Sequence, residues 1–295
     1  MELSTFTLTR RLGDHTPILI RLLGDIQWSG DEQATAMRKL ITDVEETRAQ
    51  GGYFLGFGDY GDFASPSNRQ RLDGAALYDT AKSVLDKTAL ELTRDLYLRA
   101  FRKTEKRWVG LLHGHHWYRL QSGIITDQHL CEWLKAPFLG TCAAVRIQIV
   151  TGVTSRCNVT LWVHHGCGGG GKQGSPIGKL ENLAPYWGGF DVFAMGHTTK
   201  SPAAPINRVY PRWHGNGAPD LIHKKILLIN TGGYSKAYVE GVRQGNAPMG
   251  GYAEKGMMNP SVIGSPVLKI TPRLKDTGDG PTRRREWAPE ITVEI

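Results

Sequence analysis

Residues 53–62 read Tyr-Phe-Leu-Gly-Phe-Gly-Asp-Tyr-Gly-Asp, a short apolar run that leads into two aspartates. The segment Ile18–Gly24 repeats this arrangement, because its apolar run is also followed by an aspartate, Asp25. Short apolar runs bounded by glycine are typical of buried strands. Both segments therefore predict strands that carry a carboxylate at their C-terminal ends.

Three further apolar runs lead into histidines. Trp108–Leu112 precedes His-Gly-His-His, Val159–His164 continues into His-Gly, and Phe190–Ala194 is followed by Met-Gly-His. The C-terminal ends of strands are where α/β sheets bind their ligands. A set of Asp and His side chains at one such edge indicates a divalent-metal site with oxygen and nitrogen ligands.

The remaining pattern predicts an α/β protein. Helical spacing indicates a helix after residues 29–31 that ends at Gly51-Gly52, a shorter one after Ser67 and a longer one from about Val84 to Lys106. The second half is richer in strands, and its expected elements are a helix over Ile177–Leu183 and strands over Val145–Val150, Lys225–Ile229, Val267–Ile270 and Ile291–Ile295.

This order of elements favours two facing mixed β-sheets flanked by helices, a four-layer α/β sandwich. We expect one domain over residues 1–295, with a motif core at about 18–270 and a C-terminal strand extension at 271–295. No segment rich in proline or serine separates two domains.

Composition describes an ordinary globular chain. Of 295 residues, 40% are hydrophobic and 22% charged, which argues against disorder. No apolar stretch approaches the roughly 20 residues of a membrane span, and the N-terminal residues lack the apolar core of a signal peptide. Together with four cysteines that form no C-x-x-C pair, this predicts a cytoplasmic protein without a membrane partner. The net charge of +8 suits a polyanionic partner without requiring one.

The ordered blocks resemble those of the calcineurin-like metallophosphoesterases. That family carries D-x-H, G-D-x-x-D, G-N-H-[DE], a histidine after a strand and G-H-x-H, in this order. The counterparts here are Gly24–Gln27, Gly58–Asp62, Gly114–Trp117, His164–Gly166 and Gly196–Thr199. No single block is specific, whereas the ordered set of five is.

The resemblance implies two adjacent divalent ions bridged by Asp59. We expect Mn²⁺, with Mg²⁺, Zn²⁺, iron or Ni²⁺ as alternatives. Two such ions activate a bridging water and neutralise the phosphoryl oxygens. The implied ligands are Asp25, Gln27 and Asp59 for the first ion, and Asp59, His115, His164 and His197 for the second. The resemblance also assigns catalysis to His116, with Asp62 orienting its ring.

The chain departs from the family pattern at three positions. Gln27 replaces the usual histidine, His115 the usual asparagine, and Thr199 the last histidine of G-H-x-H. We therefore expect the first ion to bind more weakly than the second. His214 or His223 offers an alternative source for the missing ligand.

Two adjacent histidines, His164 and His165, compete for one ligand position. Side chains alternate along a strand, so both cannot easily face the same ion. The family pattern favours the first of such a pair, and this selects His164.

The glycine-rich loop Gly166–Gln173 is expected beside the metal site, where Lys172 and Thr199 would contact substrate. The loop also resembles a Walker A sequence, but Gln173 stands where Ser or Thr should hold Mg²⁺. Aromatic loops around Tyr210–His214 and Tyr234–Tyr252 are candidates for a substrate groove, since bases stack on such rings.

The expected function is hydrolysis of phosphoesters, with a phosphodiesterase or nuclease acting on DNA, RNA or nucleotides as the leading hypothesis. A non-catalytic module that binds nucleic acid or protein is the alternative that Gln27 and Thr199 motivate. A phosphomonoesterase or protein phosphatase is suggested by residues 58–62, although Phe63 stands where a phosphate-binding arginine is expected.

Overall fold

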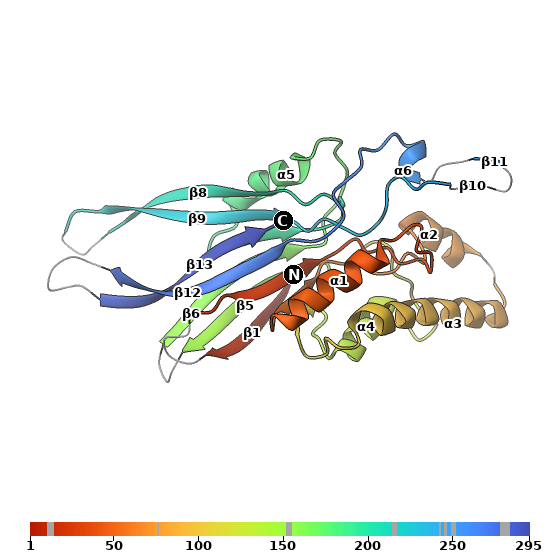
Figure 1. Cartoon of the computed structure of the whole chain (residues 1–295), viewed down its shortest axis with the longest axis horizontal. Helices are drawn as coiled ribbons and strands as arrows, with labels where there is room; N and C mark the ends of the chain where they lie inside the picture. Colours follow the sequence, from red (N-terminus) through yellow and green to blue (C-terminus); the bar gives the residue numbers. More distant parts are fainter. Residues whose placement is uncertain are drawn as a thin grey trace.

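The computed structural model describes residues 1–10, 15–75, 77–151, 155–213, 217–241, 243–244, 247–248, 252–277 and 284–295. Within these residues the chain is an α/β protein with two larger mixed sheets and several helices (Figure 1). None of the described helices has both the length and the apolar character that crossing a membrane requires.

The five-stranded sheet contains β2 (Ile18–Leu23), β3 (Tyr53–Gly56), β4 (Trp108–Leu111), β12 (Val267–Thr277) and β13 (Arg284–Glu294), in the order β13-β12-β2-β3-β4. The six-stranded sheet contains β1 (Glu2–Arg10), β5 (Cys142–Thr151), β6 (Ser155–His164), β7 (Val192–Met195), β8 (Ala203–Arg212) and β9 (Asp220–Asn230), in the order β1-β5-β6-β7-β9-β8. A small third sheet pairs β10 (Arg243–Gln244) with β11 (Ala247–Pro248).

The helices are α1 (Met37–Ala49), α2 (Pro66–Gly74), α3 (Asp79–Leu96), α4 (Thr126–Leu134), α5 (Ser175–Leu183) and α6 (Tyr252–Lys255). A π-helical turn, η1 (Tyr97–Phe101), continues α3, and a 3-10 turn, η2 (Ala184–Tyr186), continues α5.

The two larger sheets bury one shared hydrophobic core. Ile20 and Leu55 of the five-stranded sheet lie in the same buried cluster as Ile147 and Val159 of the six-stranded sheet. Helices α1, α3 and α4 pack on the other face of the five-stranded sheet, and α5 packs on the other face of the six-stranded sheet (Figure 1). The order of layers is therefore helix, sheet, sheet, helix.

Parallel pairing brings the chemistry-bearing strand ends together. In one sheet β2, β3 and β4 run parallel, and in the other β6 runs parallel to β7. The C-terminal ends of parallel strands meet at one edge of a sheet. The segments that follow these strands carry Asp25, Asp59, His115, His165 and His197.

Strands β1, β8, β10 and β11 and helices α4 and α6 were not expected from the sequence. Strand β8 contains Pro205 and Pro211, and prolines disrupt a strand pattern because they cannot donate to the ladder. The structure places β8 at the edge of its sheet, where a missing donor is tolerated. The helix expected from about Val84 begins earlier, at Asp79, and changes to π-helical geometry at Tyr97.

A buried ionic network attaches α1 to the five-stranded sheet. The Asp43 carboxylate accepts hydrogen bonds from Lys39 at 2.5 Å and from the Tyr234 hydroxyl at 2.8 Å. Arg21 of β2 lies 3.6 Å from the same carboxylate and donates to Thr47 Oγ1 at 2.7 Å. Asp43, Arg21 and Tyr234 are all buried, and Ser265 completes the network, because its carbonyl accepts from Arg21 Nη1 at 2.8 Å and its hydroxyl lies 2.8 Å from that of Tyr234.

We predict that Asp43→Asn lowers the free energy of unfolding by about 3 kcal/mol, because it leaves the buried Arg21 charge without its counter-ion. Urea denaturation measures the change. Glu45→Gln, on the same helix, removes the exposed partner of Arg48 and should cost at most about 1 kcal/mol. Equal losses of unfolding free energy in Asp43→Asn and Glu45→Gln would contradict the expected contribution of the buried network to stability.

Candidate metal centre

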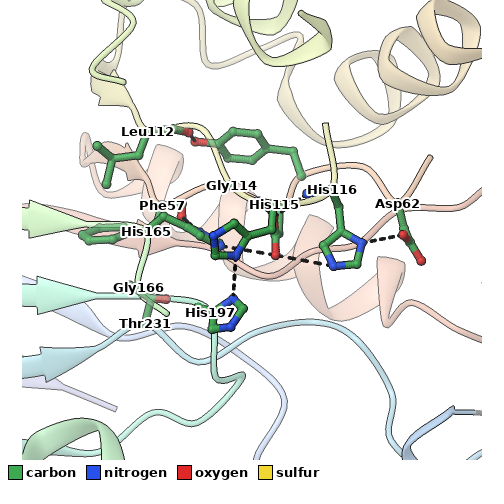
Figure 2. Close-up of polar contacts among 12 residues, drawn as sticks. Phe57, Asp62, Leu112, Gly114, His115, His116, His165, Gly166, His197 and Thr231 are labelled. Atoms are coloured by element: carbon green, nitrogen blue, oxygen red, sulfur yellow. Dashed lines mark hydrogen bonds and ion pairs between the residues drawn. The ribbon is translucent and has the colours of Figure 1, made fainter. Parts of the chain in front are cut away.

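Four side chains from four loops converge at the edge where the two sheets meet. Asp59, His115, His165 and His197 each offer a ligand atom, and these atoms lie within 4.8 Å of one another. Figure 2 shows the three imidazoles facing one another across the space between the loops. Asp59 and His165 are buried, whereas His115 and His197 are partly accessible, so the cluster is open on one side.

Asp59 holds the cluster together through both carboxylate oxygens. Oδ1 accepts hydrogen bonds from the backbone amide of His115 and from that of His116, the second at 3.0 Å. Oδ2 lies 3.4 Å from His165 Nε2 and 4.0 Å from His116 Nε2. One carboxylate therefore contacts both the loop after β4 and the loop after β6.

This contact requires glycines at two positions. A Cβ atom on Gly114 would lie 2.0 Å from Asp59 Oδ1, and one on Gly58 would lie 2.5 Å from the Gly114 nitrogen. Gly58 also has a φ of 89°, a left-handed conformation that glycine adopts without steric cost. The glycine that precedes the acidic or histidine residue in these blocks is thus needed for close packing of the loops.

The site is built on left-handed backbone. Non-glycine residues with positive φ include Asp25 (50°), Gln27 (51°), Asp59 (52°), His197 (73°) and Thr199 (54°). Such conformations are uncommon outside glycine, although Asp, Asn and His adopt them more often than other residues. Strained backbone of this kind clusters at functional sites, which supports a functional interpretation of these turns.

A backbone hydrogen bond fixes how the His165 imidazole points. His165 Nδ1 donates to the Phe57 carbonyl at 2.6 Å, which leaves Nε2 facing Asp59 (Figure 2). A histidine that donates one ring N–H to a carbonyl presents the other nitrogen as a ligand. The Nδ1 atoms of His115 and His197 approach to 3.1 Å.

The structure corrects the choice between the paired histidines: His164 does not point into the cluster. Its ring stacks on Trp162 with the ring centres 5.5 Å apart, and its Nδ1 accepts a hydrogen bond from the Gly166 amide at 2.7 Å. Val163 faces the core between the sheets, and His165 takes the position in the cluster that was expected for His164.

The alternation of side chains along β6 indicates which of the two histidines enters the cluster. Val159, Leu161 and Val163 point into the shared core, whereas Trp162 points toward α5. The residue that continues the core-facing series is His165. Counting in steps of two from the apolar residues would therefore have selected the second histidine.

Asp25 supplies a buried carboxylate without a partner. Its side chain is fully buried, and neither oxygen makes a well-formed hydrogen bond with any described residue. Burial, together with the nearby Asp59 charge, raises the pKa of Asp25. Buried polar atoms are almost always hydrogen-bonded or bound to an ion, so these orphaned oxygens fit the divalent cation that the donor set indicates.

Asp59, His115 and His197 hold their metal-binding forms without an ion, whereas His165 does not. Burial opposes charging of His165, but the hydrogen bond and charge of Asp59 outweigh it and raise the pKa of His165 to about 9, so His165 must lose a proton when metal binds. Burial alone would raise the pKa of Asp59, but the hydrogen bond and charge of His165 hold it well below the usual range. Burial and the neighbouring His165 lower the pKa of His197 to about 4 and also lower the pKa of His115. A carboxylate and two neutral imidazoles are the forms that bind metal.

His116 and Asp62 form a pair at the open side of the cluster. His116 Nδ1 donates to Asp62 Oδ1 at 2.7 Å, and Nε2 points toward Asp59 (Figure 2). Burial opposes charging of the ring, but the hydrogen bond to Asp62 and the Asp59 charge outweigh it and raise the pKa of His116. The ring is thereby oriented to bring a proton to the edge of the cluster.

The remaining residues that were expected at the site are not among the four side chains of the cluster. The backbone N–H of Gln27 donates to the Asp59 backbone carbonyl at 2.8 Å, and the Thr199 hydroxyl donates to the Thr198 carbonyl at 2.8 Å. Lys172 is exposed, and no contact of its side chain with the cluster is observed among the described residues. His223 pairs with Asn207 on the hairpin β8–β9 at 3.0 Å, so it supplies no ligand to the cluster. His214 lies outside the described residues.

Arg69 supports the site without having been expected. Its Nη1 donates to the carbonyls of Ala64 at 2.7 Å, of Trp117 at 3.0 Å and of His115. This single guanidinium therefore connects α2 to the loop that carries His115 and His116. Arg69 lies in none of the sequence blocks, so the sequence offered no signal for this role.

Comparison with known proteins gives no family assignment. No protein-family model matches the chain, and no curated protein matches its sequence. The functional interpretation therefore depends on the geometry of the cluster and on the sequence blocks that carry it.

We predict that His165→Ala weakens Mn²⁺ binding by at least about tenfold, because it removes a buried nitrogen from the cluster. The matched variant His164→Ala should bind Mn²⁺ as the unchanged protein does. Isothermal titration calorimetry measures both affinities, and circular dichroism verifies that both variants fold. A loss confined to His164→Ala would reverse the assignment.

Proposed function

We propose that the protein is a metal-dependent hydrolase of phosphoester bonds, with a metallophosphoesterase-like arrangement of its layers. The observation that carries the proposal is the cluster of Asp59, His115, His165 and His197, with the hydrogen-bonded pair of His116 and Asp62 beside it. A purely structural metal site has no need of an oriented, accessible imidazole at its open edge.

In this proposal Asp59, His115, His165 and His197 hold one divalent ion, for which Mn²⁺ is the first candidate. Asp25 and Asp59, with Gln27, hold a second. Bound ions of this kind supply an activated water and neutralise charge on phosphoryl oxygens. Asp59 would contribute to both groups of ligands, because only its Oδ1 is engaged by backbone amides.

In this proposal His116 and Asp62 supply the proton that the leaving oxygen needs. His116 carries a proton on Nδ1 that Asp62 accepts as a hydrogen bond, and the raised pKa favours a second proton on Nε2. This second proton faces the open edge of the cluster, where a leaving oxygen would need it. His116 thus acts as general acid, and Asp62 is a positioning residue.

Phosphodiesters of nucleic acids or nucleotides are the substrates we favour, because the chain carries a net charge of +8 and such substrates are anionic. A non-catalytic binding module remains the second candidate function. Thr199, whose hydroxyl turns to its own backbone, favours it by leaving the first ion short of a ligand. The intact His116–Asp62 pair favours catalysis.

We predict that the protein hydrolyses a nitrophenyl phosphodiester with added Mn²⁺ and loses this activity with chelator or in Asp59→Asn. His116→Gln should lower kcat by about 10²- to 10⁴-fold while Mn²⁺ still binds, because general acid catalysis contributes that much. His129→Gln, which changes a histidine paired with Glu132 on α4, serves as the control and should keep full activity. Unchanged kcat in His116→Gln would refute its role.

A titration with Mn²⁺ should resolve two binding steps, the second at least about tenfold weaker, because Gln27 and Thr199 leave that ion fewer nitrogen ligands. Asp25→Asn should remove the weaker step and retain the tighter one. Two ions of equal affinity would contradict the expected asymmetry. Calorimetry or the paramagnetic signal of free Mn²⁺ provides the measurement.

A further inference from the structure

A groove of about 370 Å³ begins beside the candidate general acid. It is lined by residues of α2, of α3 and of the segment that follows His116. Trp117 is one of the lining residues and comes directly after His116 in the chain. Arg69 connects groove and cluster, because its guanidinium holds the carbonyls of both Trp117 and His115.

The groove is basic. Arg69, Lys82 and Arg119 line it, and none of its described lining residues is acidic, although the exposed Asp79 carboxylate lies 3.8 Å from Lys82 Nζ. The Arg119 side chain lies over the Trp117 ring, 5.6 Å from the ring centre, and is exposed. No described carboxylate forms an ion pair with Arg119, so its charge is directed to solvent or to an anionic ligand.

The groove is also apolar. Leu72 and Leu85 contribute partly exposed aliphatic surface to its lining, and Trp117 contributes an indole ring, over which the Arg69 guanidinium lies 4.1 Å from the ring centre. Inorganic phosphate would use only the cations of such a surface. A polynucleotide uses both parts, because its phosphates contact Arg and Lys while its unpaired bases stack on aromatic and apolar side chains. Bases within a duplex are already stacked on one another, so a single strand fits better.

We propose that this groove binds a single-stranded stretch of polynucleotide next to the bond that is cleaved. The inference rests on the proposed phosphoesterase function and names its substrate class. Arg119 and Lys82 contact phosphates, and Trp117, Leu72 and Leu85 contact bases. Arg69 positions the Trp117 backbone, so the strand is held on the same loop that presents His116.

The test measures binding without turnover. Fluorescence anisotropy of a labelled dT12 strand, added to the full chain in chelator, reports the affinity with no metal present. Arg119→Glu should weaken binding by at least about fivefold and make it less sensitive to salt, because a phosphate contact is lost. Lys82→Glu should act in the same direction.

The matched control is Arg38→Glu, which makes the same change of charge on the exposed side of α1. It should bind dT12 as the unchanged protein does. Equal weakening in Arg38→Glu and Arg119→Glu would overturn the proposal, because binding would then depend on overall charge alone. Tighter binding of a 12-base-pair duplex than of dT12 would also overturn it.

Hydrolysis of the nitrophenyl phosphodiester by the unchanged protein tests the phosphoesterase function separately from the groove. Hydrolysis without any effect of Arg119→Glu on dT12 binding would refute the groove and leave the phosphoesterase. A selective effect of Arg119→Glu in a protein that hydrolyses no phosphodiester would support the groove as a binding site and refute the phosphoesterase.

Discussion

The Asp59 carboxylate is the interaction on which the rest of the site depends. Its Oδ1 accepts the amides of His115 and His116, and its Oδ2 faces His165 on the opposite sheet. The geometry is possible only because Gly58 and Gly114 let two loops approach to van der Waals contact. The positions of the imidazoles therefore follow from one buried charge.

A buried ionic network supports the same region from the helical layer. Tyr234, whose hydroxyl binds Asp43 of α1, also donates its backbone amide to the Asp25 carbonyl at 3.0 Å. The loop that carries Asp25 is thus tied to α1 as well as to β2. Such connections hold the left-handed turns in place, since strained backbone persists only where several surrounding interactions stabilise it.

Much of this arrangement could be predicted from the sequence, because apolar runs followed by Gly-Asp or Gly-His mark both the strands and their functional ends. The α/β class, strands such as β2 and β3 and the convergence of Asp59, His115 and His197 follow from that pattern. The structure places His165 rather than His164 in the cluster, and the choice of His164 relied on order within a motif instead of on the alternation of β6. Arg69 and the groove arise from tertiary contacts of α2 that no local pattern encodes.

The orphaned carboxylate of Asp25 makes cation binding and folding one linked equilibrium. In the protein without metal, Asp25 and Asp59 are buried carboxylates, and burial together with repulsion from Asp59 raises the pKa of Asp25. A divalent ion relieves this repulsion only in the folded chain, because the unfolded chain does not bring the ligands together. The concentration of the ion would thus regulate how much of the protein is folded.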